Sequence, residues 1–184
     1  MTDVDSLLRS TGAMLEGHFR LASGRHSGTY IEKFRIMEDP AATVALCGMI
    51  ADHYRGAGIT LVVGPAMGGV ILAYETARQL GIHSIYAEKD GQGGLMFDRG
   101  FKIAPGEPVL VIDDVLTTGG SVRKTLELVE ANGGKVAGVA FLIDRTNGAV
   151  DFGVPFYASH AMNVVSYPAD DCPLCRDGLP LVET

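Results

Sequence analysis

Short apolar runs alternate with amphipathic stretches along most of this chain. Runs rich in β-branched residues, such as ITLVVGP at 59–65 and PVLVIDDV at 108–115, are typical of buried strands. The stretches between them repeat apolar residues at helical spacing, and Asp39, Pro40 and Gly81 supply the caps and stops expected at helix ends. The pattern predicts strands at 59–65, 83–89, 108–115 and 135–144, and helices at 39–58, 68–81 and 119–134.

Strands that alternate with helices favour an α/β fold, with a mostly parallel sheet and helices on both faces. The first 35 residues and the last 25 fit this alternation poorly, and we expect them to fold over the sheet as a small hood. A length of 184 residues suits one domain with a full core. The predicted organisation is a single domain, 1–184, with a core at about 36–159 and a hood made of about 1–35 and 160–184.

Three loops leave the carboxyl ends of the predicted strands, at 64–69, 113–121 and 144–148. Ligands of parallel sheets bind beyond these ends, so the three loops are expected to share one site. A further segment, EKDGQGGLMFDRGFKIAPGE at 88–107, is polar and rich in glycine. It is either a mobile loop or a loose hairpin, and long polar loops of this kind are often lids over sites.

Two adjacent carboxylates, Asp113 and Asp114, follow the apolar residues of the third predicted strand. Since neighbouring strand residues point to opposite faces, one carboxylate can reach a ligand while the other faces a metal or a structural partner. Carboxylates accept hydrogen bonds from sugar hydroxyls and hold divalent cations through water. A lone Asp here would often only cap a helix, but this pair is followed by TTGGS, which favours a ligand site.

The loop TTGGS at 117–121 has the features of a monophosphate site. Its glycines let backbone N–H groups converge, its three hydroxyls add donors, and the helix that follows begins with the positive end of its dipole. The sequence contains no Walker phosphate loop, and no G-x-G-x-x-G follows a strand. Sugar hydroxyls held by the two carboxylates, beside a phosphate held by this loop, describe a ribose 5-phosphate site.

The net charge of −7 argues against a general nucleic-acid binder, which needs a basic surface. No apolar run is long enough to span a membrane, and the N-terminal stretch lacks the pattern of a signal peptide. Three cysteines make no disulfide framework, so a cytoplasmic location is expected. Cys172 and Cys175 have the spacing of a zinc knuckle, but no second Cys or His pair follows them and the five histidines show no ligand spacing, so no zinc site is predicted.

Several of these stretches resemble one enzyme family. VLVIDDVLTTGGS at 109–121 resembles the phosphoribosyl-pyrophosphate signature of type I phosphoribosyltransferases. GHFRLASGRHSGTYIEK at 17–33 is similar to the hood of the orotate phosphoribosyltransferases, FLIDRTNG at 141–148 resembles their strand that ends in Asp-Arg, and DCPLCRDGLPLV at 171–182 resembles the tail of one bacterial branch. The resemblance implies a type I phosphoribosyltransferase core. It also implies transfer of ribose 5-phosphate to orotate, which gives orotidine 5′-phosphate and pyrophosphate in pyrimidine synthesis.

The resemblance also implies roles for individual residues. Mg²⁺ is expected as the cofactor, bound mainly through phosphoribosyl pyrophosphate and through water to Asp113 or Asp114, with no direct protein ligand. A strained or cis peptide in GPAMGG at 64–69 would fit the family. The implied contacts to phosphoribosyl pyrophosphate are Asp113, Asp114, Val115, Leu116, Thr117, Thr118, Gly119, Gly120 and Ser121, those to pyrophosphate are Pro65, Ala66, Met67, Gly68 and Gly69, and those to orotate are Thr117, Arg145 and Tyr30.

The chain departs from the best-known pattern of the family at its cations. Met67 and Gly68 stand where Tyr-Lys is often found, and the loop at 88–101 lacks the family's Lys-x-x-Lys-x-His run. Lys89 matches the first loop lysine, and Arg99 and Lys102 are the other cations of the segment. Of these, Lys89 and Arg99 are predicted to stabilise the departing pyrophosphate. A homodimer is expected, with this loop near the partner's site.

Two other functions are weighed against this one. A purine-type phosphoribosyltransferase would not need Arg145 aimed at a substrate carboxylate. A non-enzymatic regulator with the same fold, binding RNA or DNA, would need a basic stripe rather than a lid.

Overall fold

The computed structural model describes residues 3–184, which divide into two compact units. The smaller unit contains Met1–Asp39 and Asn163–Thr184, and the larger unit is Pro40–Met162. The predicted hood, about 1–35 and 160–184, covers nearly the same residues as the smaller unit. That the two units act as one domain, with the hood over the sheet, stays a prediction.

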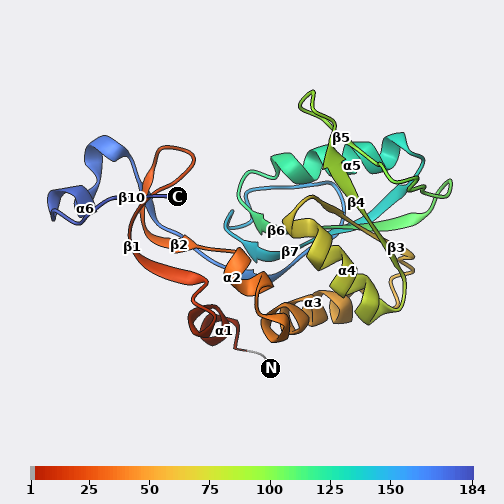
Figure 1. The fold of residues 1–184 in the computed structure, drawn as a ribbon, viewed down its shortest axis with the longest axis horizontal. Coiled ribbons are helices and arrows are strands. Elements are labelled where there is room, and N and C mark those ends of the chain that lie inside the picture. Colours follow the sequence, from red (N-terminus) through yellow and green to blue (C-terminus); the bar gives the residue numbers. More distant parts are fainter. Residues whose placement is uncertain (1–2) are drawn as a thin grey trace. The chain divides into compact units, whose positions relative to one another are not determined.

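The larger unit is built on a six-stranded sheet with the strand order β5-β4-β3-β6-β7-β8 (Figure 1). The strands β3, β4, β6, β7 and β8 are parallel to their neighbours, and β5 alone pairs antiparallel, with β4. The mostly parallel sheet predicted from the alternation of strands and helices is therefore confirmed. Its strands are β3 (Leu61–Pro65), β4 (His83–Lys89), β5 (Leu95–Met96), β6 (Pro108–Leu116), β7 (Lys135–Asp144) and β8 (Phe156–Ala161).

Helices cover both faces of this sheet, as predicted. The helices α3 (Pro40–Tyr54) and α4 (Gly68–Leu80) lie on one face, and α5 (Gly120–Ala131) lies on the other (Figure 1). Alternate residues of each strand face opposite sides, so every central strand contributes to two cores. The core on the α5 side contains Leu61, Val63, Val109, Val111, Val122, Val129, Val139 and Phe141, all of them buried.

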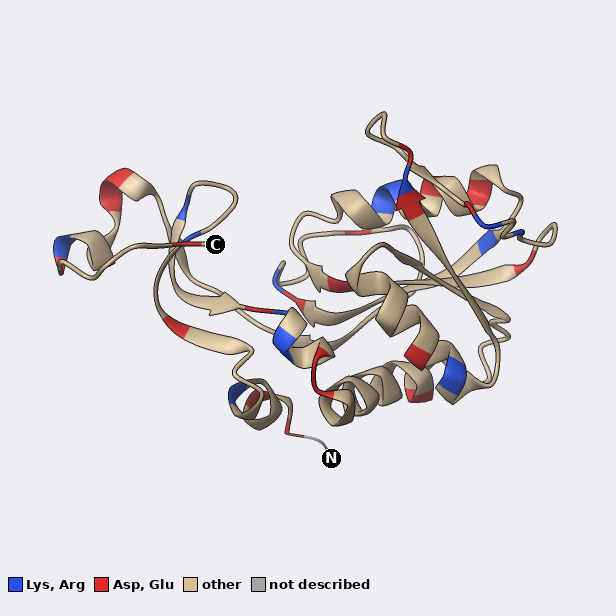
Figure 2. Cartoon of the chain, viewed as in Figure 1, with Lys and Arg blue, Asp and Glu red and all other residues tan. Residues whose placement is uncertain are grey.

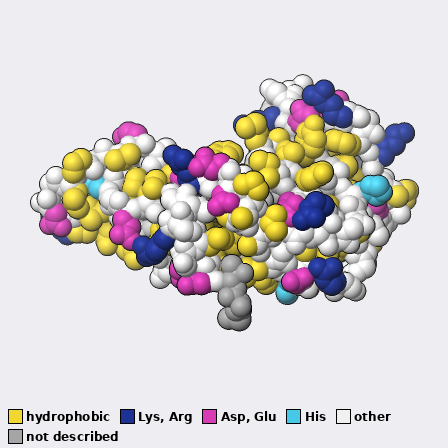
Figure 3. Space-filling model, turned by 60° about the horizontal axis from the view of Figure 1, so that its bottom comes forward, with side chains coloured by type: hydrophobic (Ala, Val, Ile, Leu, Met, Phe, Trp, Pro, Cys, Tyr) yellow, Lys and Arg dark blue, Asp and Glu magenta, His cyan; other side chains and the backbone are white. Residues whose placement is uncertain are grey.

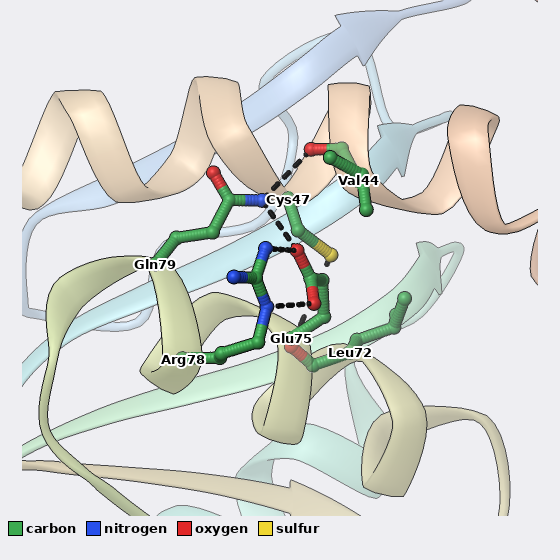
Figure 4. Close-up of polar contacts among 6 residues, drawn as sticks. All are labelled: Val44, Cys47, Leu72, Glu75, Arg78 and Gln79. Carbon is green, nitrogen blue, oxygen red and sulfur yellow. Dashed lines mark hydrogen bonds and ion pairs between the residues drawn. The ribbon is translucent and has the colours of Figure 1, made fainter.

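The two helices on the first face are joined by a polar network (Figure 4). Both carboxylate oxygens of Glu75 accept hydrogen bonds from the Arg78 guanidinium, each at 2.8 Å. Gln79 bridges to the neighbouring helix, because its Nε2 donates to Glu75 Oε1 at 2.7 Å and to the Val44 carbonyl at 2.9 Å. The Arg78 hydrogen bonds lower the pKa of Glu75 against the opposing effect of burial. Burial raises the pKa of the nearby Cys47 thiol to about 12, so this thiol stays protonated.

The smaller unit holds a four-stranded sheet in the order β10-β1-β2-β9. The hairpin of β1 and β2 comes from the start of the chain, and the two outer strands come from its end. The sheet therefore joins residues more than 130 positions apart in the sequence. The elements of the smaller unit are α1 (Val4–Ser10), β1 (Met14–Arg20), β2 (His26–Ile31), α2 (Phe34–Met37), β9 (Ser166–Tyr167), the 3-10 helix η1 (Ala169–Asp171), α6 (Pro173–Arg176) and β10 (Val182–Glu183).

One conclusion about the histidines was wrong. His18 and His26, on neighbouring strands, bring their ring nitrogens to within 4.8 Å of the sulfurs of Cys172 and Cys175. The second pair of potential ligands precedes the cysteines by about 150 positions rather than following them, because the end of the chain returns to the first hairpin.

Other differences concern the extent of elements. The strand predicted at 108–115 continues to Leu116. The strand β8 of the larger unit and the four strands of the smaller unit were not predicted. Among residues 3–184, none of the helices has the length and apolar character that a membrane crossing requires.

Candidate functional site

The carboxyl ends of β3, β6 and β7 lie next to one another in the sheet, since β6 pairs with both of the others in parallel. The three loops selected from the sequence all leave this edge. The edge is also where parallel sheets bind their ligands. The structure thus brings the predicted loops of the larger unit to one place.

The two carboxylates of β6 lie inside the strand ladder rather than beyond its end. Asp113 pairs with Phe141 in the register of β6 and β7, and both Asp side chains are buried. Asp113 accepts hydrogen bonds from the Ser121 hydroxyl at 2.7 Å and from its neighbour's backbone N–H at 2.9 Å. Asp114 accepts one from the Val115 N–H at 2.7 Å. These bonds help to fix the orientation of the two carboxylates near the carboxyl end of β6.

The 117–121 loop turns sharply into α5. Its Gly119 adopts the left-handed conformation, with φ of 77°, directly before the helix begins at Gly120. A Cβ on Gly119 would also lie 3.1 Å from the ring of Phe152, so both backbone and packing favour glycine here. Thr117 and Thr118 are exposed at the head of the loop. The unpaired N–H groups of the first turn of α5 thus open toward the same edge, as an anion site requires.

The 64–69 loop has two glycines in close contact. A Cβ on Gly64 would lie 2.1 Å from the Gly69 carbonyl oxygen, and a Cβ on Gly69 would lie 2.7 Å from Pro65 Cδ. The peptide bond between Ala66 and Met67 is cis, which confirms the expectation of a strained or cis peptide there. Gly68 then begins α4. The loop is folded back on itself so tightly that its backbone, rather than its side chains, forms its inner surface.

A cavity of about 620 Å³ joins these loops within the larger unit. It brings the predicted pyrophosphate loop and the predicted phosphate loop together with Lys89, as the sequence reasoning expects. It also contains a cation that sequence reasoning missed, Lys124 of α5. Basic segments of β4 and α5 lie side by side there (Figure 2). The lining residues are Pro65, Ala66, Lys89, Gly91, Gly93, Gly94, Leu95, Gly120, Ser121 and Lys124.

The spacing of Lys124 offers a signal that could have identified it. It lies three residues after Ser121 in α5, and residues three and four apart share one helix face. A lysine one turn after an anion-binding helix start is placed to reach the same anion.

The 88–101 segment forms the hairpin that was one of its two predicted structures. Glu88 pairs with Met96 across β4 and β5. Asp90 closes the turn by accepting the N–H groups of Gln92 and Gly94 at 2.7 and 2.9 Å, and these bonds lower its pKa. Lys124 Nζ donates to the Gly93 carbonyl at 2.7 Å, which links the tip of the hairpin to α5.

The second predicted cation, Arg99, is engaged elsewhere. Its Nε lies 3.5 Å from Glu88 Oε1 and 3.6 Å from Asp98 Oδ2, and it is absent from the lining of the cavity. The Glu88 carboxylate raises the pKa of Arg99. Its catalytic role stays a prediction, and it would require the hairpin to change conformation.

Arg145 follows β7 directly beside the phosphate loop. Its backbone N–H donates to the Leu116 carbonyl at 3.0 Å, which ties the start of the 144–148 loop to the end of β6. The preceding Asp144 is buried and accepts the Thr146 N–H and hydroxyl, both at 2.7 Å, so the turn after the strand is fixed. Arg145 and Thr117 therefore leave adjacent strand ends.

Tyr30 lies in the smaller unit, on β2. Its ring packs against Phe19 with 5.6 Å between ring centroids. Its contact with orotate stays a prediction.

Comparison with known proteins now adds to this geometry. Residues 35–152 match the phosphoribosyl transferase domain model. The chain is 49% identical to the orotate phosphoribosyltransferase of Pelotomaculum thermopropionicum. The alignment covers 98% of the chain and 95% of the relative. This chain belongs to the orotate phosphoribosyltransferase family. It is also 47% identical, over 98% of the chain and 94% of the relative, to the orotate phosphoribosyltransferase of Chlorobaculum parvum.

Solved structures agree with the fold of this phosphoribosyltransferase. The crystal structure of orotate phosphoribosyltransferase from Aeropyrum pernix matches 86% of the chain and 93% of its own length, with a TM-score of 0.75 and 29% identity. The resemblance identified from 17–33, 109–121 and 141–148 is confirmed as far as the family and fold are concerned.

Proposed function

We propose that this phosphoribosyltransferase transfers ribose 5-phosphate from phosphoribosyl pyrophosphate to the ring nitrogen of orotate, in the synthesis of pyrimidine nucleotides. The C1′–O bond breaks and pyrophosphate leaves with its electron pair. The ring nitrogen of orotate loses its proton and bonds to C1′. The observation that carries the proposal is that one cavity is lined by residues of the 64–69 loop, by Lys89 and by the first turn of α5.

The sugar phosphate is held at the end of β6. The N–H groups of the first turn of α5 and the hydroxyls of Thr117 and Thr118 bind the 5′-phosphate, and the helix dipole favours its charge. Asp113 and Asp114 accept hydrogen bonds from the ribose hydroxyls, as carboxylate oxygens readily do. These groups fix the position of C1′ before the base arrives.

The leaving group lies against the 64–69 loop. Its backbone amides bind pyrophosphate, while Lys89 and Lys124 face the same cavity with two positive charges. As the C1′–O bond breaks, negative charge grows on the leaving oxygen and the sugar becomes oxocarbenium-like. Cations already in place stabilise that charge without reorganisation.

Arg145 is proposed to bind the carboxylate of orotate, and Thr117 to contact the same ring. The Arg145 N–H to Leu116 bond places this cation one strand away from the phosphate loop. A guanidinium matches a carboxylate with two parallel hydrogen bonds, which selects orotate over uracil or a purine.

Mg²⁺ is proposed as the cofactor, and the residues present fit it. Asp113 and Asp114 are adjacent, buried carboxylates near the carboxyl end of β6. They suit a hydrated ion held through water rather than a dry cage of protein ligands. When bound, Mg²⁺ would neutralise part of the pyrophosphate charge.

The 88–101 hairpin is proposed to close over the substrates and exclude water. It already contributes Gly91, Gly93, Gly94 and Leu95 to the cavity wall. Its bond from Lys124 to the Gly93 carbonyl is a polar link that closure can exchange for contacts with phosphate oxygens. Removal of the hairpin should reduce turnover far more than orotate binding, and unchanged turnover would exclude the lid.

A homodimer is proposed as the working form. Met67, Ile71 and Tyr74 lie on one face at the start of α4 and are 74%, 44% and 66% exposed. Hydrophobic side chains are visible on the surface of the larger unit (Figure 3), and such exposed patches are typical of protein interfaces. Tyr74→Glu should yield monomers in light scattering, whereas a dimer that persists would place the interface elsewhere.

In the dimer, the 88–101 hairpin is proposed to lie near the partner's site and to supply Arg99 to it. If it does, Arg99→Ala and Arg145→Ala, each with low activity alone, should regain activity when mixed, because a mixed dimer then contains one site with neither change. Absence of recovery in a proven mixed dimer would mean that the hairpin serves its own subunit. A cytoplasmic location is also proposed, because none of the three cysteines is paired in a disulfide, as is usual in a reducing compartment.

One assay tests the reaction itself. Protein, Mg²⁺ and phosphoribosyl pyrophosphate are mixed separately with orotate, uracil, adenine and hypoxanthine, and nucleotide and pyrophosphate are measured. Product with orotate alone supports the proposal, and product with a purine would favour the purine-type enzyme. Product in none of the mixtures would favour the non-enzymatic regulator. Arg145→Ala should raise the KM for orotate by about tenfold or more, the value of one charge-assisted hydrogen bond, and leave the KM for phosphoribosyl pyrophosphate nearly unchanged.

A further inference from the structure

Four side chains that the transfer reaction does not use meet in the smaller unit. His18 on β1 and His26 on β2 come from the first hairpin. Cys172 directly precedes the short helix α6, and Cys175 lies within it. His18 Nε2 lies 2.9 Å from His26 Nδ1 and 3.6 Å from each of the two sulfurs. Cys175 Sγ lies 3.3 Å from His26 Nδ1. Among residues 3–184, these four side chains form the group that could hold a metal ion, because their ligand atoms all lie within 4.8 Å of one another.

The protonation of His18 is fixed by its surroundings. Its Nδ1 lies 2.9 Å from the Leu179 carbonyl, which can only accept a hydrogen bond. Nδ1 therefore carries the proton of the neutral ring, and Nε2 presents a lone pair to the other three groups. A metal-ligating histidine typically has this arrangement, with its second nitrogen donating to a backbone carbonyl.

The spacing of the four atoms matches a tetrahedral ion. Zn–N bonds of about 2.0–2.1 Å and Zn–S bonds of about 2.3 Å imply edges of about 3.3–3.8 Å between ligand atoms. The three sulfur–nitrogen separations of 3.6, 3.6 and 3.3 Å fall in this range, and every pair of ligand atoms lies within 4.8 Å. The two imidazole nitrogens, at 2.9 Å, are closer than a tetrahedral edge and would move apart by about 0.4 Å to hold the ion. Two thiolates and two imidazoles with tetrahedral spacing favour Zn²⁺ over the oxygen-seeking Mg²⁺ and Ca²⁺.

The location of the cluster also accounts for how the end of the chain is held. Of residues 169–184, only Cys172 is buried, at 1% exposed, so this segment buries almost no apolar surface of its own. His18 and His26 are 2% and 5% exposed. The segment is attached to the β1–β2 hairpin by the short β10 pairing and by this cluster. Small units with little core usually require such a staple.

We propose that His18, His26, Cys172 and Cys175 bind one structural Zn²⁺ that fastens the 169–184 segment to the β1–β2 hairpin. Both thiols lose their protons to solvent on binding, and all four protein ligands together fill the coordination sphere. The closed set leaves no position for substrate or reactive water, so the ion stabilises the fold and takes no part in the transfer. The inference does not depend on the proposed function.

Metal analysis of the full chain is the first test. Protein purified without chelator and dialysed against metal-free buffer should contain one zinc ion per chain, measured by inductively coupled plasma mass spectrometry. Replacement by Co²⁺ should give the intense visible bands of a tetrahedral site, with charge-transfer absorption from thiolate. Absence of bound zinc together with failure to take up Co²⁺ would overturn the proposal. A Cys172–Cys175 disulfide in freshly purified protein, seen by mass after alkylation, would overturn it as well.

Substitutions then assign the ligands. Cys175→Ser and His26→Asn should lose the zinc and the thiolate absorption, and trypsin should cut first within 169–184. The matched controls Cys47→Ala and His83→Gln change a cysteine and a histidine of the larger unit and should keep one zinc ion per chain. Since a ligand variant can fail to fold, wild-type protein is also treated with a strong chelator and then resupplied with zinc. Tail protection that is lost and regained supports the proposal, and protection that never changes refutes it.

Discussion

Replacing Gly64 by alanine tests whether the backbone of the 64–69 loop binds pyrophosphate. The new Cβ would lie 2.1 Å from the Gly69 carbonyl oxygen and 2.5 Å from its carbonyl carbon, while ordinary contact begins at 3.4 Å. The two backbone segments must therefore separate by about 1.3 Å, since a close-packed backbone has no flexible side-chain end to yield. A displacement of about 1 Å in a positioned reactant costs on the order of 100-fold in rate. We expect kcat/KM for phosphoribosyl pyrophosphate to fall by about that factor.

The assay follows the loss of orotate absorbance with phosphoribosyl pyrophosphate varied and orotate saturating. Overpacking should also cost about 1–3 kcal/mol of stability, so unfolding by urea is measured on the same samples. Gly81→Ala is the matched control at the other end of α4. Gly81 has φ of 72° and open space around it, so alanine there should cost about 1 kcal/mol from backbone strain. It should keep normal kinetics. A folded Gly64→Ala protein with kcat/KM within about threefold of wild type, below 1 kcal/mol of transition-state energy, would refute the role of this backbone.

Three further substitutions probe the site and its support. Ser121→Ala removes the hydroxyl that donates to Asp113 at 2.7 Å and so loosens the carboxylate that is proposed to accept the ribose hydroxyls. The KM for phosphoribosyl pyrophosphate should rise about tenfold, the worth of one charge-assisted bond. An unchanged KM would contradict the role of the Ser121–Asp113 pair. Tyr54→Phe removes the buried hydroxyl that donates to the Val139 carbonyl at 2.9 Å. The free energy of unfolding, measured in urea, should fall by about 1–2 kcal/mol, while kcat stays the same. An unchanged free energy of unfolding would show that this hydrogen bond makes no net contribution to stability. The lowered pKa of Glu75 means that its carboxylate stabilises the fold at pH values above its ordinary pKa of 4.5, and that this contribution is lost as the pH falls through the lowered value. Glu75→Gln should therefore lose less stability between pH 7 and pH 2 than wild type, whereas Glu127→Gln, an exposed carboxylate, should match wild type. Equal acid sensitivity in all three proteins would exclude the Glu75 network as a source of acid sensitivity.

The sequence predicted those parts of the site whose functional residues lie close together along the chain. The phosphate loop, the glycines of the 64–69 loop and the strand ending in Arg145 each carry their chemistry within a few positions. The parallel order of the strands then brings them together without further information, because carboxyl ends of parallel strands share one edge. Local sequence patterns were therefore sufficient to predict these parts of the site, because the parallel sheet brings their loops to one edge.

The features that were missed depend on contacts between distant segments. Lys124 reaches the cavity because the 88–101 hairpin folds back toward α5, which the hairpin sequence alone does not reveal. His18 and His26 meet Cys172 and Cys175 only after the end of the chain has returned to the first hairpin. Arg99 was selected by its charge, but its side chain is paired with Glu88 in this conformation.

The split composition of the smaller unit has a consequence for the order in which the protein is made. Synthesis proceeds from the N-terminus, and domains fold as units as they emerge from the ribosome. Residues 40–162 form the whole larger unit, so its sheet does not require residues 163–184 in order to assemble. The β1–β2 hairpin is the first sheet segment to emerge, yet its partners β9 and β10 are among the last. The larger unit can therefore fold while the β1–β2 hairpin still has open edges, and these edges are what a chaperone would have to protect until β9 and β10 have paired.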